Sequence, residues 1–157
     1  MRLEIRTVGD RTDLRRLARF LLTQALWYPR YERWVNETCI PEIDLGQKAA
    51  LVAYEQGGVV GDIVWQPHKE LPRTRELKNL RVDPSFRRRS LAYFLLRQAE
   101  AEGQGSFDRI LCDTDKRQTS TMKLLRFAGY KSIGEMPIYS SANMDVILVK
   151  ELGPVAQ

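Results

Sequence analysis

The second half of the sequence alternates strand-like and helix-like stretches, and this alternation constrains the fold more than any other feature. Residues 75–82 (RELKNLRV) predict a strand, and residues 90–102 predict a helix whose apolar side chains recur at helical spacing. A second strand is predicted over 108–113 and a second helix over 119–128. A helix between two strands of one sheet brings the chain back in the same direction, so parallel pairing is expected here.

The other strand-like stretches predict antiparallel pairing. Residues 50–55 and 59–66 are separated by the turn sequence QGG, a pattern typical of a β-hairpin. Two further strands are predicted near the carboxyl end, over 130–136 and 143–150. The sheet is therefore expected to be mixed, with a parallel pair among antiparallel strands.

The amino-terminal part predicts a strand over 2–8 followed by two helices. Asp10 or Thr12 is suited to cap the first helix, because a short polar side chain accepts a hydrogen bond from an unpaired backbone N–H. A second helix is predicted over about 30–38, and Pro41 is expected to end it because proline lacks the N–H of a continuing helix. The apolar residues of the first helix are Leu14, Leu17, Leu21 and Ala25.

Length and composition indicate an ordinary globular chain. The 157 residues fit one domain, expected over 1–152, with 153–157 as a disordered tail. No run of about 18 apolar residues is present, so no membrane-spanning helix and no membrane partner are expected. Cys39 and Cys112 lie far apart and are expected to be reduced thiols of a cytoplasmic protein. The single histidine, His68, offers little for a metal site, and none is predicted.

The chain carries a formal net charge of +5, from 25 Lys and Arg against 20 Asp and Glu. This excess suits an anionic partner: nucleotide phosphates, nucleic acid or an acidic protein surface. It is equally compatible with general surface composition, so charge alone does not choose among these readings. No dense basic stripe is expected away from the arginines at 87–89, which weighs against nucleic acid.

Three consecutive arginines stand where the strand at 75–82 passes into the following helix. A helix amino terminus presents unpaired N–H groups and a partial positive charge, which favour a phosphate. Arg87, Arg88 and Arg89 add full charges there, and the small side chains of Ser90 and Ala92 leave room for an anion. The alternative is a solvated turn whose arginines only raise solubility.

This segment resembles the signature of the GCN5-related N-acetyltransferases, the GNAT family. The signature is Arg or Gln, two residues, Gly, one residue, and then Gly or Ala, after a Val-x-Pro strand end. The sequence has V-D-P at 82–84 and then RRRSLA, in which Arg87 and Ala92 match, whereas Ser90 stands in place of the glycine. The element order also matches along nearly the whole chain. The resemblance implies a mixed α/β (α+β) GNAT fold, with a mostly antiparallel sheet of about seven strands flanked by about four helices.

The resemblance also implies acetyl-coenzyme A as co-substrate, without a metal. The pyrophosphate is expected at the arginine-rich junction, and the pantetheine arm along the main chain of the strand end before it. Gln118 stands at the family's asparagine position at the start of the last helix. The expected binding residues are Leu80, Arg81, Val82, Arg87, Arg88, Arg89, Ser90, Leu91, Ala92 and Gln118.

For the chemistry, the resemblance implies direct attack of an amine on the acetyl thioester in a ternary complex. Glu76 is the candidate general base, because some relatives use a glutamate on this strand; the alternative is a surface glutamate paired with Lys78. In the last helix, which ends in FAGY as in the family, Leu125 replaces the tyrosine that in many relatives protonates the departing thiolate. A hydroxyl from Thr121, one turn earlier on the same face, or solvent is the expected substitute.

The acceptor site has weaker signals. Asp113 and Asp115, at the end of a predicted strand, either meet a cationic acceptor or cap the turn into the last helix. Four aromatic residues lie where relatives form the acceptor wall, although the same helical spacing is typical of a packed core. These are Trp27, Tyr28, Tyr31 and Trp34.

Three functions are compatible with these features. The first is an N-acetyltransferase that acts on a small-molecule, peptide or protein amine. The second is a protein that binds acetyl-coenzyme A and regulates a partner without transfer, which the departures at Ser90 and Leu125 favour. The third is a toxin that acetylates aminoacyl-tRNA, which the net charge favours. A monomer or a homodimer is expected.

Overall fold

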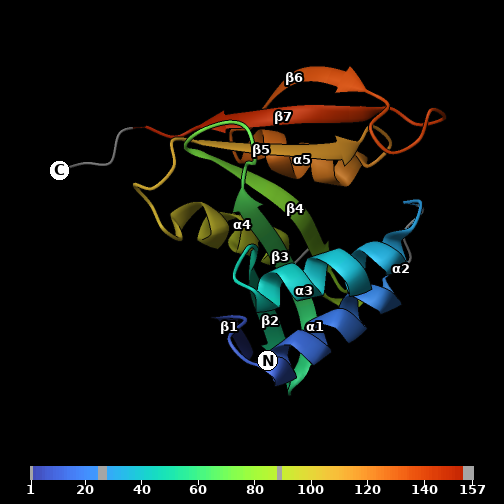
Figure 1. The fold of residues 1–157 in the computed structure, drawn as a ribbon, viewed down its shortest axis with the longest axis vertical. Coiled ribbons are helices and arrows are strands. Elements are labelled where there is room, and N and C mark those ends of the chain that lie inside the picture. Colours follow the sequence, from blue (N-terminus) through green and yellow to red (C-terminus); the bar gives the residue numbers. More distant parts are fainter. Residues whose placement is uncertain (1, 25–27, 88–89, 154–157) are drawn as a thin grey trace. The chain divides into compact units, whose positions relative to one another are not determined.

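The structure is a computed structural model that describes residues 2–24, 28–87 and 90–153 (Figure 1). In these residues seven strands form one sheet in the order β1-β2-β3-β4-β5-β7-β6. The strands are β1 (Leu3–Thr7), β2 (Ala49–Glu55), β3 (Gly58–Pro67), β4 (Thr74–Val82), β5 (Arg109–Asp115), β6 (Lys131–Met136) and β7 (Asp145–Glu151). The pair β4–β5 is parallel, and β1–β2, β2–β3, β5–β7 and β6–β7 are antiparallel. The predicted mixed, mostly antiparallel sheet is thus confirmed.

Helical segments connect the strands. They are α1 (Arg11–Thr23), α2 (Tyr31–Trp34), the π-helical η1 (Val35–Cys39), α3 (Ile40–Asp44), the 3₁₀ turn η2 (Pro84–Phe86), α4 (Leu91–Ala101) and α5 (Thr119–Phe127). The contacts gather into two compact units, Met1–Gln66 with Lys78–Ala99, and Pro67–Leu77 with Glu100–Gln157. Strand β4 contributes its first half to the second unit and its second half to the first. A single domain over 1–152 stays a prediction, and of the expected tail only Gly153 is among the described residues.

Helix α1 begins where the sequence predicts. The carboxylate of Asp10 accepts a hydrogen bond of 2.7 Å from the backbone N–H of Asp13, which satisfies one unpaired donor of the first turn. The buried side chains of α1 pack with residues of η1, α3 and strands β2 and β3 to form the core of the first unit, on one face of these strands (Figure 1). The core members from α1 are Leu14, Leu17, Phe20 and Leu21. Ala25, expected in the same stripe, lies outside the described residues.

The predicted end of the second helix before Pro41 is wrong, because helical structure continues through α2, η1 and α3 to Asp44. Pro41 lies in the first turn of α3, directly after the π-helical turn. In that turn the N–H of Ile40 donates to the carbonyl of Val35, five residues back. In a regular α-helix a proline leaves the carbonyl four residues back without a donor, and its ring clashes with that carbonyl. The wider π-helical turn avoids both problems, so the helix continues past Pro41.

The hairpin of β2 and β3 has a two-residue turn. Gln56 and Gly57 have φ values of 50° and 80°, the left-handed geometry of the turn that matches the twist of two antiparallel strands. Gly58, which the sequence places in the turn, is the first residue of β3 and pairs with Glu55. The register places Asp62 of β3 opposite Val52 of β2, in the middle of a buried strand.

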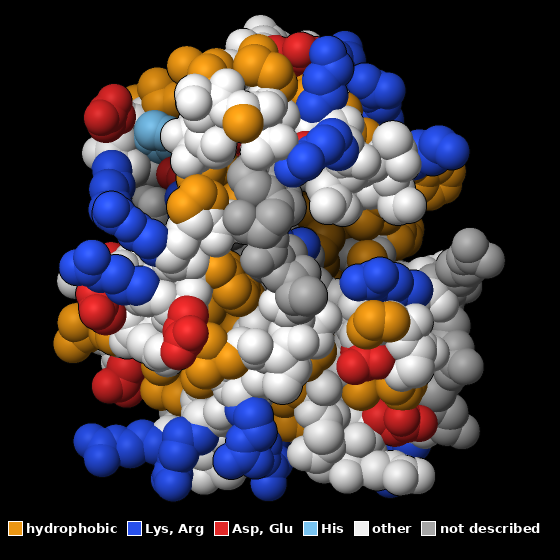
Figure 2. Space-filling model, turned by 90° about the vertical axis from the view of Figure 1, so that its right-hand side faces the viewer, with side chains coloured by type: hydrophobic (Ala, Val, Ile, Leu, Met, Phe, Trp, Pro, Cys, Tyr) orange, Lys and Arg blue, Asp and Glu red, His pale blue; other side chains and the backbone are white. Residues whose placement is uncertain are grey.

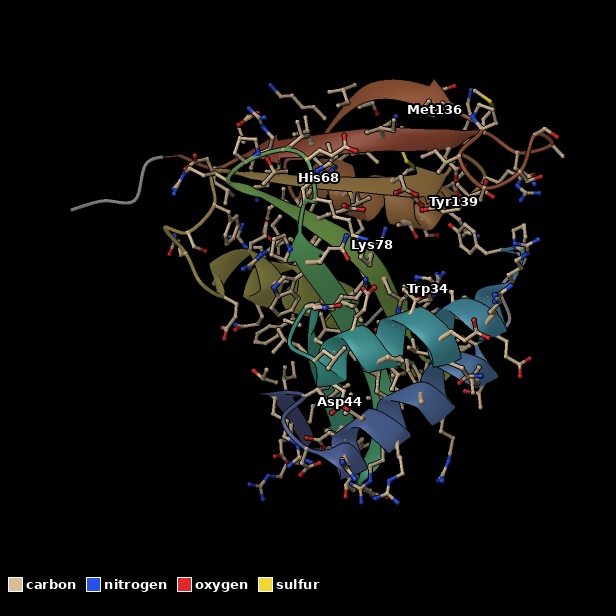
Figure 3. The ribbon with its side chains drawn as sticks, viewed as in Figure 1. Trp34, Asp44, His68, Lys78, Met136 and Tyr139 are labelled. Carbon is tan, nitrogen blue, oxygen red and sulfur yellow. The ribbon has the colours of Figure 1, made fainter. Side chains whose placement is uncertain are left out.

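The second unit contains β5, β6, β7 and α5. Met122 and Leu125 are the buried residues of α5. Gly129 has a φ of 97° where the chain leaves the helix, and Tyr130 beyond it is 2% exposed, as expected for a core aromatic residue. Strand β6 is exposed along its whole length, and the exposed side chain of Met136 marks its end (Figure 3).

Positive charge on the surface is not confined to the arginines at 87–89. Helix α1 carries a row of four exposed arginines, which makes a basic stripe away from residues 87–89; the expectation of no such stripe is wrong. The helical period explains it, since Arg11, Arg15 and Arg19 recur every four residues and Arg16 lies next to Arg15, on the side opposite the core. These residues are Arg11, Arg15, Arg16 and Arg19. Figure 2 shows Lys and Arg side chains grouped at the lower edge of one face. Within the described residues, no helix has the length and apolar character needed to cross a membrane.

Candidate functional site

The junction between β4 and α4 is a tight, hydrogen-bonded turn. The N–H of Asp83 donates to the carbonyl of Val60 on β3 at 2.8 Å, which fixes the end of β4. The Asp83 carboxylate then accepts the backbone N–H of Ser85 at 2.9 Å and so caps η2. Hydrogen bonds from the side chain and backbone of Ser85, followed by the charge of Arg87, lower the pKa of Asp83. The arginine-rich segment therefore starts from a fixed strand end.

Arg87 is exposed, and its Nε donates to the carbonyl of Val82 at 3.3 Å. This bond uses one donor of the guanidinium and keeps the charge beside the start of α4. Arg88 and Arg89 lie outside the described residues. Next in the chain, Ser90 is exposed with a φ of 60°, and its carbonyl accepts the N–H of Phe94 at 3.0 Å, which opens the helix. Glycine adopts this left-handed backbone conformation without strain, whereas serine does not.

The preceding strand, β4, separates from β5 before it ends. The parallel register of β4 with β5 covers Thr74, Arg75 and Glu76, so in the described residues the segment Lys78–Val82 is not part of that ladder. Its expected binding residues, Leu80 and Arg81, are half-buried. Together with the opening of α4, where Leu91 is buried and Ala92 half-buried, the first unit offers main-chain groups, a helix amino terminus and an arginine in succession. This arrangement fits an extended ligand that carries phosphate.

Glu76, the predicted base, lies in the half of β4 that belongs to the second unit. Its Oε2 is 3.9 Å from Nε2 of His68, and both side chains are half-buried. His68 follows β3 (Figure 3), and its Nδ1 accepts the N–H groups of Glu70 and Leu71 at 3.1 and 3.0 Å. The imidazole thus organises its own loop and places its other nitrogen toward the carboxylate.

The predicted residues of the last helix also belong to the second unit. Gln118 is exposed at the start of α5; its N–H donates to the carbonyl of Asp115 at 2.9 Å, and its own carbonyl accepts from Met122 at 3.0 Å. Thr121 is half-buried, and Leu125, four residues on, is 4% exposed. The two therefore share one face of α5, as the helical spacing predicts.

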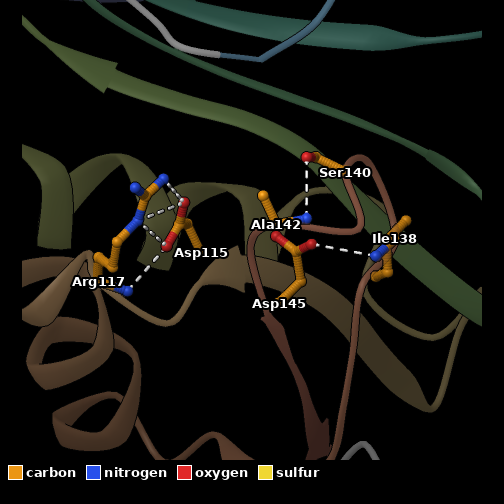
Figure 4. Close-up of polar contacts among 6 residues, drawn as sticks. All are labelled: Asp115, Arg117, Ile138, Ser140, Ala142 and Asp145. Atoms are coloured by element: carbon orange, nitrogen blue, oxygen red, sulfur yellow. Dashed lines mark hydrogen bonds and ion pairs between the residues drawn. The ribbon is translucent and has the colours of Figure 1, made fainter.

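Asp115 caps the turn before α5, one of the two roles expected for it. It accepts the N–H of Arg117 at 2.8 Å and pairs with the Arg117 guanidinium at 2.7 Å, which lowers the pKa of its carboxyl (Figure 4). Asp145, opposite Asp115 in the β5–β7 ladder, is fully buried and accepts the N–H of Ile138 at 3.2 Å. Burial raises the pKa of Asp145, against the hydrogen bond from Ile138. Asp115 and one oxygen of Asp145 thus hold the loops around them, whereas Asp145 Oδ1 is buried without a hydrogen-bond partner among the described residues.

A cluster of buried polar side chains in the first unit was missed from the sequence. We call Tyr31, Asp62, Asn79 and Arg81 the Asp62 cluster. Asp62 on β3 is fully buried, and its Oδ2 accepts a hydrogen bond of 2.8 Å from Nδ2 of Asn79 on β4. Asp62 Oδ1, Tyr31 Oη and Arg81 Nε are buried atoms without a hydrogen-bond partner among the described residues. Since buried polar groups are normally paired, three such atoms in one cluster need an explanation.

The electrostatics of the cluster show that its members face one another. Burial raises the pKa of Asp62 to about 7, against the hydrogen bond from Asn79 and the charge of Arg81. Burial likewise raises the pKa of Tyr31 to about 12, with the Arg81 guanidinium acting in the opposite direction and the Asp62 carboxylate in the same one. A hydrogen-bond contribution from the Arg81 side chain also lowers the pKa of Tyr31, so the guanidinium lies beside this hydroxyl. Tyr31 Oη and Arg81 Nε themselves have no partner within the usual hydrogen-bond distance and angle among the described residues.

Part of this cluster carried a sequence signal. Asp62 interrupts the apolar run VVGDIVW, and a single acid at the centre of a buried strand is unusual enough to mark a site. Tyr31 was expected either in an acceptor wall or in the core, and it stacks on Trp34 with ring centroids 6.1 Å apart at the edge of the core. Trp27 lies outside the described residues. Among the described residues, no group of three or more His, Cys, Asp or Glu side chains is placed to hold a metal ion.

Comparison with known proteins gives a consistent result. A family model described as the acetyltransferase (GNAT) family matches residues 15–130. A search of the curated proteins finds no match. Many solved structures share the fold, among them a protein from Desulfovibrio desulfuricans assigned to the GNAT family, with a TM-score of 0.85, 15% identity, and coverage of 97% of this chain and 100% of that one.

Two other solved structures are similar along nearly their whole length. An aminoglycoside 6'-N-acetyltransferase complexed with coenzyme A has a TM-score of 0.77 and 20% identity, with both chains covered completely. The ribosomal-protein-S18-alanine N-acetyltransferase from Escherichia coli has a TM-score of 0.75 and 15% identity, with 99% of this chain and 97% of that chain covered. At these identities the likeness establishes the fold and leaves the acceptor open.

Proposed function

Since this chain belongs to the acetyltransferase (GNAT) family, we propose that it is an acetyl-coenzyme A-dependent N-acetyltransferase that acts on a primary amine. The observation that carries the proposal is the succession of a strand segment outside the β4–β5 ladder, an arginine and a helix amino terminus at the β4–α4 junction. The solved relative complexed with coenzyme A supports the same ligand.

Coenzyme A would be held by the residues of this junction. The amino terminus of α4 and Arg87 would bind the pyrophosphate, because N–H groups, the helix dipole and a guanidinium all favour a negative charge. The main chain of Leu80, Arg81 and Val82 would hydrogen-bond the pantetheine amides, as it is outside the β4–β5 ladder. When bound, acetyl-coenzyme A supplies the acetyl group as a thioester.

Proton movement is the part of the reaction that the side chains must manage. An amine attacks only in its neutral form, so a carboxylate or a water chain must take up its proton. Glu76 is the sequence candidate for this step, and the imidazole of His68 lies beside its carboxylate. The departing thiolate needs a proton in return, for which Thr121 on the partly exposed face of α5 is the candidate.

Direct binding of acetyl-coenzyme A tests this proposal first. Replacing Arg87 alone and together with Arg89 by alanine should raise the Kd for acetyl-coenzyme A by about tenfold or more, because charge-assisted contacts to the pyrophosphate are lost. Arg19→Ala, at an exposed position of α1, is the matched control and should leave the Kd unchanged. An unchanged Kd in the double variant would contradict the proposal.

Transfer is measured separately, as thiol release from acetyl-coenzyme A across a panel of amines. Release that depends on the amine establishes the enzyme. Tight binding without release from any amine would instead support the regulatory reading suggested by Ser90 and Leu125. Glu76→Gln and Thr121→Val then test the two sequence candidates for proton transfer: the variant of a residue that moves a proton should lower kcat while the Kd for acetyl-coenzyme A stays unchanged.

One observation favours a second candidate acceptor, an aminoacyl-tRNA. The exposed arginines of α1 form a positive surface of the kind that binds a phosphate backbone. Replacing Arg15, Arg16 and Arg19 by glutamine should then weaken binding of tRNA and reduce its salt dependence, with acetyl-coenzyme A binding unchanged. If tRNA binding is absent in the native protein, this candidate is excluded.

A further inference from the structure

The three unpartnered atoms of the Asp62 cluster come from segments far apart in the sequence. Tyr31 lies on α2, Asp62 on β3 and Arg81 on β4, yet all three belong to the first unit. Side chains alternate across a strand, so Asp62 shares the face of Val64, which packs in the core formed with α1, η1 and α3. Gly61 faces the other way, toward Leu91 and Leu95 of α4. The Asp62 carboxylate is therefore directed to the helical side of the sheet.

The arrangement costs free energy as long as these buried atoms have no hydrogen-bond partner. A buried carboxylate oxygen, a buried hydroxyl and a buried guanidinium nitrogen each forfeit hydration without a hydrogen bond in return. Asn79 satisfies only one oxygen of Asp62. Other charged or titratable groups act near the cluster. Burial raises the pKa of Cys39 on η1 to about 12, and the charges of Asp62 and Glu42 act in the same direction, whereas Lys48 and Lys78 act on that thiol in the opposite direction. None of these donates a hydrogen bond to Asp62 Oδ1.

The three atoms without partners indicate which groups a ligand would need. Asp62 Oδ1 and Tyr31 Oη accept hydrogen bonds from an N–H group, whereas Arg81 Nε donates to an oxygen. A primary amine satisfies the first two atoms, and an oxygen on a neighbouring carbon of the same molecule satisfies the third. We propose that the Asp62 cluster is the amine-acceptor site, in which Asp62 binds the amine nitrogen and takes its proton, and Arg81 and Tyr31 position a primary amine that carries a neighbouring carbonyl, carboxylate or hydroxyl oxygen.

This inference rests on the proposed function, and Arg81 provides the link to it. The main chain of Arg81 lies in the β4 segment assigned to the pantetheine arm, while its side chain reaches the Asp62 cluster. In this assignment the main chain of Arg81 binds the pantetheine arm and its side chain binds the acceptor, so the same residue brings the amine close to the thioester. In this assignment Asp62 performs the step for which the sequence suggests Glu76.

Acetyl transfer at this site involves one bond exchange and the loss of two protons from the amine nitrogen. The ammonium gives one proton to the Asp62 carboxylate and becomes a neutral amine. The nitrogen lone pair forms a C–N bond to the thioester carbonyl carbon, the C–S bond breaks, and its electron pair leaves on sulfur. A second proton from nitrogen passes to the thiolate, so that the products are the N-acetyl compound, coenzyme A thiol and protonated Asp62, which then releases its proton to water. A carboxyl with a pKa near 7 is suited to this exchange close to neutral pH.

Binding of the acceptor can be observed without turnover. Three probes share a phenylethylamine body: L-phenylalanine amide and L-phenylalanine carry the neighbouring oxygen, and 2-phenylethylamine does not. The ¹⁵N–¹H resonance of Arg81 Nε, identified by its loss in Arg81→Lys, should shift with the first two amines and remain in place with the third. A stronger shift with the amide indicates a peptide-like amino terminus, and a stronger shift with the carboxylate indicates a free amino acid. No shift with any probe, in a protein that still binds acetyl-coenzyme A, overturns the inference.

Kinetics separate a reacting group from a structural one. Asp62→Asn keeps the shape and the bond with Asn79 but cannot take a proton. With the best probe it should lower kcat/KM by about 100-fold or more and remove the rise of the rate near pH 7, while the KM for acetyl-coenzyme A changes by less than about twofold. Asp44→Asn, at the exposed end of α3 (Figure 3), is the control and should retain the native pH profile.

Two further outcomes distinguish this inference from proton transfer by Glu76 and from failure of the proposed function. If Glu76→Gln removes the pH-dependent rise and Asp62→Asn does not, Asp62 is not the proton acceptor and the inference fails while acetyl transfer stands. If native protein does not bind acetyl-coenzyme A at all, the proposed function fails first. Tyr31→Phe should raise the KM for the amine by about tenfold without changing the pH profile, as expected of a positioning residue.

Discussion

The hydroxyl of Tyr54 on β2 donates a hydrogen bond of 2.6 Å to the buried carboxylate of Asp13 on α1. Nη2 of Arg6 donates to the same oxygen at 2.9 Å, and its guanidinium lies 4.6 Å from the centre of the Tyr54 ring. Burial alone would raise the pKa of Asp13, but the hydrogen bonds from Tyr54, the backbone of Gly9 and Arg6 outweigh it, and the pKa is lowered. These contacts hold α1 against strands β1 and β2 of the first unit.

Tyr54→Phe should therefore destabilise the protein by about 2 kcal/mol, because a hydrogen bond to a buried charge is lost while the ring is kept. Asp13 has a lowered pKa in the folded state, so its stabilisation is fully present above its ordinary pKa of 3.8 and is lost as the pH falls below it. The difference between native and variant proteins in urea unfolding should shrink in the same range. Tyr139→Phe, at a side chain 42% exposed (Figure 3), is the control; equal losses in both variants would contradict this account.

Ser90→Gly should stabilise the protein by about 0.5–1 kcal/mol, since glycine adopts a φ of 60° without the clash that a Cβ brings. It should also lower the Kd for acetyl-coenzyme A, because the junction then opens α4 without strain and leaves more room. Ser90→Ala keeps the Cβ and serves as the comparison. Should the glycine variant be less stable than the alanine variant, the backbone geometry at this position is not the one described.

Gly61→Val should cost about 2 kcal/mol or more through overpacking. A Cβ at Gly61 would lie 3.2 Å from a methyl group of Leu95 and 3.3 Å from the carbonyl oxygen of Arg81, so α4 would have to move away from β3. Displacement of α4 should also weaken acetyl-coenzyme A binding. The matched control is Gly134→Val on the exposed strand β6, where nothing lies within 4 Å of the added Cβ, and thermal unfolding compares the two.

Lys150→Met should destabilise the second unit by about 3 kcal/mol, because it leaves the carboxylate of Glu100 buried without its cation. Lys150 Nζ lies 2.6 Å from Glu100 Oε2, and their side chains are 16% and 6% exposed. Replacing both residues, Lys150→Met with Glu100→Leu, should recover most of the loss. Lys116→Met removes an exposed ion pair with Glu135 and should change the unfolding free energy by less than about 0.5 kcal/mol; a similar loss there would argue against the role of burial.

Several elements could be predicted because their signals are local. The cap at Asp10 depends on one short polar side chain before an apolar stripe, and the structure confirms it. The hairpin turn depends on a glycine that tolerates positive φ, and it lies where predicted with Gly58 moved into the strand. The parallel pairing of β4 with β5 follows from the helix between them. In each case the determining interactions involve residues within a few positions of one another.

Other features depended on distant partners. The sequence could not show that a π-helical turn before Pro41 would let the helix continue, because that turn is set by packing of Val35 and Cys39 in the core. Nor could it show that Ser90 takes a left-handed conformation, since serine rarely does so on its own.

The order of strands and helices, the family signature at 87–92 and therefore the expected cofactor could be predicted from local sequence patterns. Tertiary structure decided that Tyr31, Asp62 and Arg81 meet, with three of their polar atoms left without partners. The physical reason is that backbone periodicity and turn geometry are encoded over short stretches, whereas desolvation and unmet hydrogen bonds exist only after segments far apart in the chain have packed together and excluded water.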